Sequence, residues 1–367
     1  MDAGPAPPLT LAALRAQLAA WGAGPQHEAR VLRDWLQCRD PAAARRKPEH
    51  FLPLALRQGF GALKEDLARL ARVQSQHAGA DGALRLLVGL HDGATVESVL
   101  LAPTRTPALC VSTQVGCAVG CTFCATGRGG LERQLGSAEI VAQVVMARRL
   151  QPVQKVVFMG MGEPAHNLEA VIEAIQCLGQ EGGIGHKQLV FSTVGDRRAF
   201  EQLPLQRVKP ALALSLHTTK PTLREQLLPR APRLTPAELV DAADVYARTT
   251  GYPAQIQWTL IEGVNDGDDE LEALAALLGG RHAMLNLIPF NEVEGSAFRR
   301  PPIERAAAMA RWLHRRGVLT KLRNSDGQDV DAGCGQLRAR HAPGTVQPLR
   351  RLRITGPVPT PARGSAG

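Results

Sequence analysis

Three cysteines spaced as CxxxCxxC form the most distinctive chemical feature of the sequence. Cys117, Cys121 and Cys124 lie in the stretch "CVSTQVGCAVGCTFCATG", which also contains Cys110. Thiolates are soft ligands that suit iron–sulfur clusters or zinc, and three of them on one loop can hold one metal centre. A cuboidal cluster bound by three thiolates keeps one iron free for another ligand. A zinc site completed by a distant Cys or His is the alternative, although zinc ligands usually come as two separated pairs.

The other cysteines and the N-terminal stretch favour a reducing compartment. The total of seven is odd, and Cys38, Cys177 and Cys334 are scattered, which is not a secreted disulfide framework. The first residues, "MDAGPAPPLTLAALRAQLAAWG", have no basic start and no continuous apolar run. No later segment approaches the length of a membrane span. We therefore expect a cytoplasmic protein with no signal peptide and no membrane contact.

The charge of the chain is unevenly distributed. The net charge is +9, and the segment after Cys334 contains six arginines and no acidic residue. This basic tail, residues 338–367, is rich in Pro and Gly, so we expect it to be disordered and attracted to polyanions such as RNA or DNA. A solvated tail without a partner is the alternative. With only eight Phe, four Trp and two Tyr, an aromatic platform for stacked bases is not supported.

From about residue 108 onward, short β-rich runs alternate with segments of helical apolar spacing. The strands are expected at residues 108–112, 155–160, 188–193, 211–216, 256–260, 284–289 and 318–322. The first helix is expected to begin at Ser137, which acts as its N-cap. Further helices are expected at residues 167–180, 235–247, 268–278 and 303–316. Such alternation predicts an α/β fold with a parallel sheet, here a partial (β/α)6 barrel over residues 108–337.

The residues before the barrel show other patterns. Residues 1–80 are predicted to form a small helical accessory domain, because "LAALRAQLAAWG" and "EDLARLARVQ" have helical spacing without intervening strands. "LRLLVGL" and "VESVLLA" are separated by "HDGA", which predicts a β-hairpin within residues 81–107 that leads into the barrel. With 367 residues and 44% apolar composition, the chain is long enough for one large core and a smaller domain.

Polar residues recur where the predicted strands end. In barrels of this kind the chemistry lies at the carboxyl ends of the strands. The sequence places there Gly162, Glu163, Ser192, Ser215, His217 and Asn291. One such residue alone is more often a cap or a satisfied core residue than a ligand. Their recurrence on the edge that carries the cysteines predicts a functional site.

Several motifs occur in an order that matches a known family. CxxxCxxC with Phe123 before its last cysteine resembles the radical S-adenosylmethionine (SAM) superfamily. "FMGMGEPAHNL", "FSTVG", "ALSLH", "GVNDGDDE", "LNLIPFN" and "DVDAGCGQL" follow in the order seen in the RlmN and Cfr family of RNA adenine methyltransferases. The resemblance covers residues 97–337. It implies a [4Fe-4S] cluster on Cys117, Cys121 and Cys124, and two SAM molecules per turnover, one as methyl donor and one as radical source.

The resemblance also implies roles for single residues. The positions that match the SAM site are Gly162, Glu163, Ser192, Ser215, Leu216, His217 and Asn291. Cys334 matches the cysteine that is methylated on sulfur. The methyl group on this sulfur then becomes a carbon radical and adds to adenine. Cys110 matches the cysteine that frees the product through a transient disulfide, and Glu97 matches the proton acceptor. Without the resemblance, Glu97 would be expected to be an exposed strand residue, and Cys110 and Cys334 to be buried thiols.

The implied activity is methylation at C2 of an adenosine in 23S rRNA and/or tRNA, with a flavodoxin- or ferredoxin-type reductant and a monomeric enzyme. Methylation at C8, as in the Cfr branch, is the first alternative. A radical SAM enzyme for a small molecule and a non-catalytic RNA-binding or zinc-stabilised protein are further alternatives. The stretch "TTKPTLREQLLPRAPRL", Asp326 and Gly333 depart from the family pattern. The catalytic chemistry is therefore better supported than the identity of the RNA.

Overall fold

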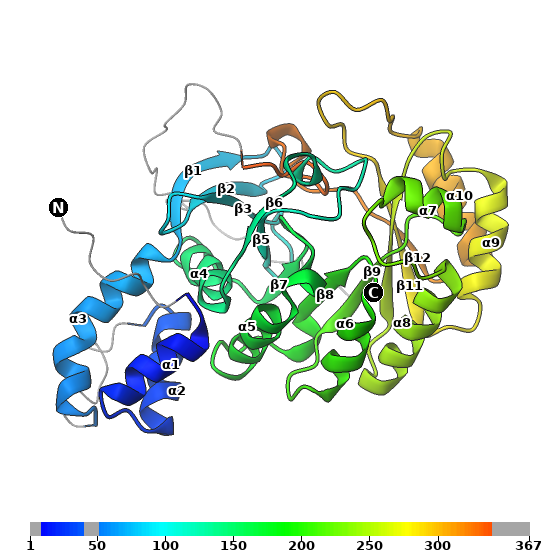
Figure 1. The fold of residues 1–367 in the computed structure, drawn as a ribbon. Coiled ribbons are helices and arrows are strands. Elements are labelled where there is room, and N and C mark those ends of the chain that lie inside the picture. Colours follow the sequence, from blue (N-terminus) through cyan, green and yellow to red (C-terminus); the bar gives the residue numbers. More distant parts are fainter. Residues whose placement is uncertain (1–8, 40–50, 340–367) are drawn as a thin grey trace, which may run out of the picture.

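The computed structural model describes residues 9–39 and 51–339, and a ten-stranded sheet forms its centre (Figure 1). The strands are hydrogen-bonded in the order β1-β2-β3-β4-β7-β8-β9-β10-β11-β12. The first pairings are antiparallel and join β1 (Arg72–Ala78), β2 (Leu84–Gly89), β3 (Thr95–Leu100) and β4 (Ala108–Cys110). The later pairings are parallel and join β4 to β7 (Lys155–Phe158), β8 (Leu189–Thr193), β9 (Ala211–Ser215), β10 (Ala254–Leu260), β11 (Ala283–Pro289) and β12 (Thr320–Leu322).

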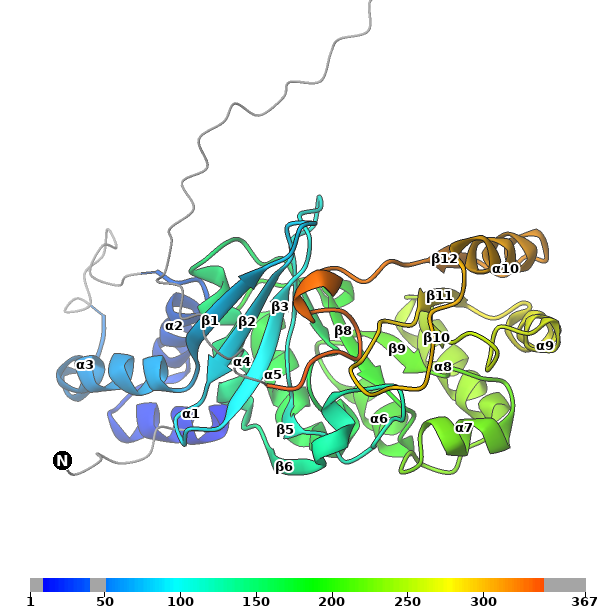
Figure 2. The ribbon, with the colours of Figure 1, turned by 90° about the horizontal axis from the view of Figure 1, so that it is seen from above.

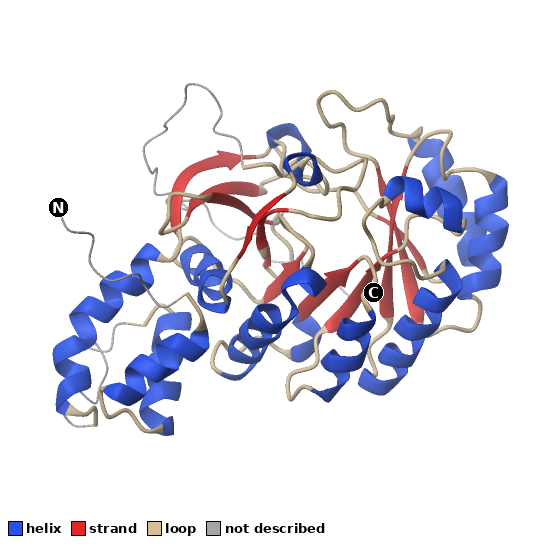
Figure 3. Cartoon of the chain, viewed as in Figure 1, coloured by secondary structure: helices blue, strands red, loops and turns tan. Residues whose placement is uncertain are grey.

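Helical crossovers connect the parallel strands, because the end of one strand and the start of the next lie at opposite edges of the sheet. They contain α4 (Ser137–Arg148), α5 (Leu168–Gln180), α6 (Arg197–Gln202), α7 (Pro221–Leu227), α8 (Pro236–Thr250), α9 (Asp268–Leu278) and α10 (Ile303–Arg315). Figure 3 shows these helices along the outside of the curved sheet. In α5, Val171, Ala174, Ile175 and Leu178 are buried at helical spacing and face the sheet side. The predicted α/β fold with a partial (β/α)6 barrel is confirmed.

Three helices precede the sheet, namely α1 (Leu11–Ala20), α2 (Pro25–Leu36) and α3 (Leu54–Arg69). Two of them, α1 and α2, pack against the barrel, since the Leu11 N–H donates to Ser137 Oγ at 2.8 Å and Arg148 Nη1 donates to Leu36 O at 2.9 Å. The prediction of helices alone up to residue 80 is wrong for residues 72–78, which form β1. Pairing with β2 holds this strand, and local helical spacing did not reveal it. The predicted tail, apart from Arg338 and Ala339, lies outside the described residues.

The start of α4 also differs from the prediction. The N-cap is Gly136, and Ser137 is the first residue of the helix. Glu139 provides the cap instead, because its carboxylate accepts the Gly136 N–H at 2.8 Å. Ser137 is used to anchor α1. None of the helices in the described ranges combines the length and the apolar character that crossing a bilayer requires.

After β12 the chain returns across the barrel to the antiparallel strands, as the orange segment in Figure 2 shows. Asp81 Oδ2 accepts the Gly327 N–H at 2.7 Å, and Asp329 Oδ2 accepts the Ala80 N–H at 2.8 Å. Asp326 Oδ2 accepts the Ala102 N–H at 3.1 Å. These bonds fix the position of residues 323–337, which we name the Cys334 segment.

Candidate active site

The three predicted cluster cysteines lie on one loop, residues 117–130, between β5 (Gln114–Gly116) and β6 (Leu131–Gln134). We name it the cluster loop. Gly116 has φ 76°, and a Cβ there would lie 2.0 Å from Gly130 O, so only glycine fits where the loop begins. The Cys117 N–H donates to Gly130 O at 2.8 Å and closes the loop. All three thiols therefore lie on one closed loop.

The thiols of the cluster loop are free and influence one another. Burial raises the pKa of Cys117 to about 11, with further contributions from Glu163 and Cys124. Burial also raises the pKa of Cys121, with contributions from Cys124 and Cys117. Among the described residues, no three His, Cys, Asp or Glu side chains converge on one single-ion site. In an iron–sulfur cluster each thiolate binds a different iron, and neighbouring thiols on one loop fit that donor set.

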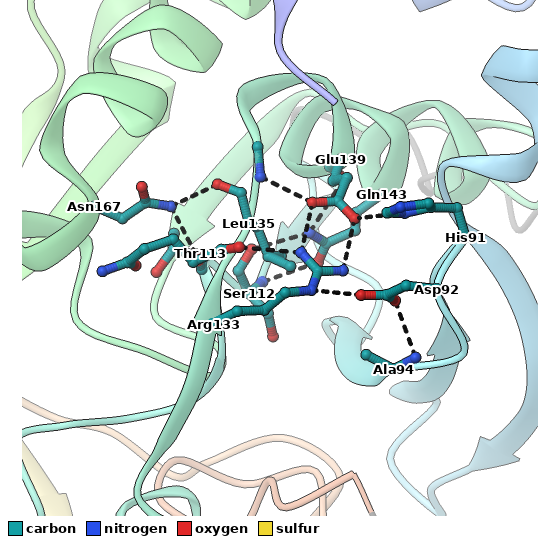
Figure 4. A network of polar contacts seen from close by, with 12 residues as sticks. His91, Asp92, Ala94, Ser112, Thr113, Arg133, Leu135, Glu139, Gln143 and Asn167 are labelled. Carbon is teal, nitrogen blue, oxygen red and sulfur yellow. Dashed lines mark hydrogen bonds and ion pairs between the residues drawn. The ribbon is translucent and has the colours of Figure 1, made fainter. Parts of the chain in front are cut away.

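A charged network holds β6, the strand that follows the cluster loop (Figure 4). Arg133, on β6, donates to the two oxygens of Glu139 at 2.9 Å each and to Asp92 Oδ2 at 2.7 Å. Glu139 is fully buried, on α4, and Asp92 lies in the turn between β2 and β3. On the same helix, Gln143 pairs with the backbone N–H and C=O of Ser112, each at 2.9 Å. The network therefore ties β6 to both the helix and the hairpin.

The Arg133→Met variant is expected to lose about 3 kcal/mol of unfolding free energy, because Glu139 would remain as a buried charge without its cation. Urea denaturation followed by circular dichroism measures the loss. The double variant Arg133→Met/Glu139→Gln is expected to recover part of it, since no buried charge remains. Equal losses in the single and double variants would contradict the electrostatic explanation.

Glu163 lies just beyond β7 with both oxygens hydrogen-bonded to backbone. Its Oε1 accepts the Ala165 N–H at 3.0 Å and its Oε2 accepts the Val194 N–H at 2.9 Å. Burial nevertheless raises the pKa of Glu163 to about 7. Gly162 has φ 106° and passes so close to Gln114 that a Cβ would meet that side chain at 2.7 Å. A buried carboxylate beside the cluster loop fits a ligand that brings a cationic group.

The ends of β8 and β9 supply Ser192, Ser215, Leu216 and His217 on the same edge of the sheet. His217 Nδ1 accepts the Thr259 N–H at 2.9 Å. The His217 ring lies edge-on to the ring of Phe123 on the cluster loop, with 4.9 Å between the two ring centroids. Burial, with Arg224 nearby, lowers the pKa of His217 to about 3, so the ring is neutral and carries its proton on Nε2. Leu216 is fully buried and can offer only its backbone.

Asn291, beyond β11, is tied to the Cys334 segment. Its Nδ2 donates to Ser325 Oγ at 2.7 Å and to Cys334 O at 3.0 Å. A Cβ on Gly333 would lie 2.9 Å from this Nδ2 and 2.6 Å from Gln336 Oε1. The glycine at position 333 therefore has a structural reason in this chain.

A cavity of about 470 Å³ brings three cysteines to one place. It is lined by Cys110 at the end of β4, by Cys124 of the cluster loop, and by Cys334. Cys110 is buried and Cys334 is exposed as a residue, although burial of each thiol raises its pKa. The Ala125 N–H donates to Gly335 O at 2.7 Å, which joins the cluster loop directly to the Cys334 segment. The structure thus assembles the cysteines that the sequence singled out.

Glu97 is fully buried, contrary to the expectation for an ordinary strand residue. Arg85 Nη1 donates to its Oε1 at 2.7 Å, and the Arg338 N–H donates to its Oε2 at 3.0 Å. Burial raises the pKa of Glu97. Through its bond to the Arg338 N–H, Glu97 holds the backbone just after the Cys334 segment. Glu97 is not among the described residues that line the cavity.

Arg224, on α7, is a site residue that the sequence analysis missed. It is 4% exposed and donates to Val194 O and, at 3.2 Å, to Ser215 O. Burial lowers the pKa of Arg224 to about 10, against the opposing influence of Cys121 and Glu163, so it remains a cation beside the cluster loop. An isolated arginine in a short helix gives no sequence signal for this position.

Comparison with known proteins agrees with the geometry. Residues 111–278 match the family model described as the radical SAM superfamily. A probable RNA methyltransferase of Methylibium petroleiphilum is 66% identical over 327 residues, which cover 89% of this chain and 92% of that protein. A probable RNA methyltransferase of Azoarcus sp. is 62% identical over 345 residues, 94% of this chain and 98% of that protein. The crystal structure of a radical SAM methyltransferase from Sphaerobacter thermophilus is 36% identical, has a TM-score of 0.79, and covers 91% of this chain and 98% of that chain. The chain therefore belongs to the radical SAM superfamily, in one family with these probable RNA methyltransferases.

Proposed function

We propose that this protein methylates C2 of an adenosine in RNA, as a member of the RlmN and Cfr family. The observation that carries the proposal is the single cavity lined by Cys110, Cys124 and Cys334. A radical SAM enzyme for another substrate needs the cluster cysteines, but it does not need two further thiols facing them. The ring carbons of adenine are poor nucleophiles, so ordinary methyl transfer from a sulfonium is unsuitable and a radical route is required.

Membership of the superfamily implies a [4Fe-4S] cluster and SAM. When bound, these groups supply an electron and the 5′-deoxyadenosyl radical that starts the reaction. We propose that Cys117, Cys121 and Cys124 hold the cluster, and that Glu163 receives the cationic amino group of SAM. Gly162 allows the close approach of the backbone. The hydroxyls, backbone and amide of the remaining SAM residues give the polar contacts that its ribose and carboxylate require, from Ser192, Ser215, Leu216, His217 and Asn291.

The Glu163→Gln variant is expected to bind SAM about tenfold or more weakly, because a neutral amide loses the charge-assisted bond to the ammonium. Equilibrium dialysis of the anaerobically reconstituted protein with labelled SAM measures the affinity. The control is Glu169→Gln on α5, outside the site. Equal SAM affinity of the Glu163→Gln variant and the unaltered protein would contradict the assigned role.

The cysteines and Glu97 divide the later steps in this proposal. Cys334 sulfur accepts a methyl group, this methyl group would lose a hydrogen atom to the 5′-deoxyadenosyl radical, and its carbon would then form the new bond to the adenine carbon. Cys110 attacks Cys334 sulfur, and the bond between that sulfur and the carbon attached to adenine breaks. The carbon takes up a proton, so the base leaves with a methyl group and a disulfide remains between the two cysteines. Glu97 accepts the ring proton, for which its raised pKa makes it a stronger base than an exposed glutamate. Two SAM molecules are consumed per product, one for each role.

RNA is the proposed substrate because the relatives named above are probable RNA methyltransferases and the chain carries a net charge of +9. We propose 23S rRNA and/or tRNA as the RNA, a flavodoxin or ferredoxin as the electron donor, and a monomer in the cytoplasm as the working form.

Mass spectrometry of nucleosides from ribosomal and transfer RNA, with and without the gene, tests the function. Loss of 2-methyladenosine in the deletion strain is expected. Loss of 8-methyladenosine instead would replace the C2 assignment with C8. No change in either nucleoside would contradict adenosine methylation.

A further inference from the structure

The cavity that holds the thiols extends into a polar barrel interior. Such interiors are normally filled by layers of branched apolar side chains. In this chain the cavity lining contains five carboxamides, those of Gln188, Gln255, Gln257, Asn286 and Asn324. The amide of Gln257 is buried, and the one hydrogen bond that it makes with the described residues is a long contact of 3.5 Å to Gln255 O. Buried polar groups with so few internal partners indicate a polar ligand.

Two cations face the same cavity, Lys155 at the start of β7 and Arg323 just after β12. Arg323 Nε donates to Asn286 Oδ1 at 3.0 Å, which orients the guanidinium and keeps its other donors available. Burial, Arg323 and Lys321 all lower the pKa of Lys155. Within residues 9–39 and 51–339 the ammonium has no ion-pair partner. Asp326 is the carboxylate in the lining, and its Oδ2 is bonded to the Ala102 N–H.

The strand register sets the distance between Lys155 and the thiol-bearing residue Cys110. Lys155 pairs with Ala108, and Val157 pairs with Cys110 on the neighbouring strand. Lys155 and Cys110 therefore face the same side of the sheet, two residues apart along it, which is roughly 7 Å. A ligand with a base at the thiols and an anion at Lys155 needs to be about one nucleotide long.

We propose that Lys155 and Arg323 form a phosphate subsite that binds the RNA backbone next to the adenosine placed at Cys334. This inference rests on the proposed function. The Arg323 fork and the Lys155 ammonium suit a phosphodiester, and the carboxamides suit the edges of a base. Exposed Lys321 extends the positive charge toward the outside of the barrel.

Lysine footprinting of the unaltered, anaerobically reconstituted protein tests the subsite directly. The acetylation rate of each lysine is measured by mass spectrometry with no ligand, with an adenosine-containing RNA oligomer, with AMP and with adenosine. The oligomer is expected to slow acetylation of Lys155 at least tenfold and that of exposed Lys187 less than twofold. Equal rates for Lys155 with and without the oligomer would overturn the proposal. Equal protection by AMP and by the oligomer would assign the subsite to a free nucleotide and overturn the RNA assignment.

Substitution of Lys155 and Arg323 gives an independent test of the phosphate subsite. Lys155→Gln and Arg323→Gln are each expected to raise KM for RNA about tenfold with little change in kcat, and to reduce the slope of log K against log salt by about 0.7. Lys155→Arg is expected to restore both values, which loss of a merely structural side chain would not allow. Arg311→Gln, which removes an exposed charge on α10, is the matched control. Unchanged KM and slope in both Gln variants would refute the subsite.

The two proposals fail in different ways. Methylated adenosine produced by a Lys155→Gln/Arg323→Gln enzyme with an unaltered KM would refute the subsite and leave the methylation function intact. RNA protection of Lys155 in a protein whose gene deletion changes no methyladenosine would support the subsite and refute the methylation function.

Discussion

The Cys110→Ala variant is expected to become covalently joined to RNA and to stop after a single reaction. In the proposed function, the carbon added to adenine remains bonded to Cys334 sulfur until Cys110 attacks that sulfur. Both thiols line one cavity, and Cys334 contributes to the raised pKa of Cys110, so they are close enough to interact. No other cysteine of the described residues is placed to substitute for Cys110, because Cys124 is a proposed cluster ligand.

Denaturing gel electrophoresis with labelled RNA measures this outcome. The variant is expected to give a protein–RNA band that survives denaturation, and the double variant Cys110→Ala/Cys334→Ala is expected to give none. Cys177→Ala is the matched control, since Cys177 is an equally buried thiol on α5 outside the cavity. The Cys110→Ser variant separates a folding defect from a chemical one. Multiple turnover by either Cys110 variant at the normal rate would refute the disulfide step.

The barrel could be predicted from sequence because its strands are buried on both faces. Parallel strands of this kind give continuous apolar runs bounded by turn residues, as in residues 211–215, where β9 is buried along nearly its whole length. The predicted ends agree with the observed ones to within about two residues. Helices with clear apolar periodicity, such as α9 at Asp268–Leu278, were predicted over the observed range.

Elements held by pairing alone were missed. The stretch "RVQSQHA" of β1 has no long apolar run, and it becomes a strand because β2 lies beside it. The ribbon of β5 and β6 has strands of three and four residues, which are too short for a periodic signal. Their register depends on Gly116 and on the buried Glu139, whose contact with Arg133 the sequence does not show.

The functional residues divide in the same way. The proposed cluster cysteines have a diagnostic spacing within one loop, so the sequence alone was enough to propose them. Cys110, Cys334 and Glu97 came only from the family resemblance, because their proximity depends on the return of the chain after β12. Arg224 and Lys155 were missed. Nothing local distinguishes a buried arginine or a lysine inside a barrel from the exposed ones.

The Cys334→Ala variant is expected to lower adenosine methylation by on the order of 10³-fold or more, the scale seen when an enzyme loses its nucleophile. The fold should persist, since Asn291 binds the Cys334 backbone carbonyl and Gly335, with φ 86°, shapes the segment without help from the thiol. SAM affinity and the absorbance of the reconstituted cluster are therefore expected to stay normal. Mass spectrometry of the RNA nucleosides measures the loss, and Cys38→Ala, at an exposed thiol outside the cavity, is the control.

The same thiol predicts a pH dependence for its methylation. Burial raises the pKa of Cys334, and Asp326 and Cys124 add to the rise, so at neutral pH the nucleophilic thiolate is a small fraction. That fraction, and with it the rate of methyl transfer to sulfur in a single-turnover assay, is expected to increase about tenfold per pH unit below the pKa. Asp326→Asn removes one of the charges that disfavour the thiolate and is expected to shift the profile toward lower pH. A rate that is independent of pH from 7 to 9 would show that Cys334 is not the group that titrates in this step.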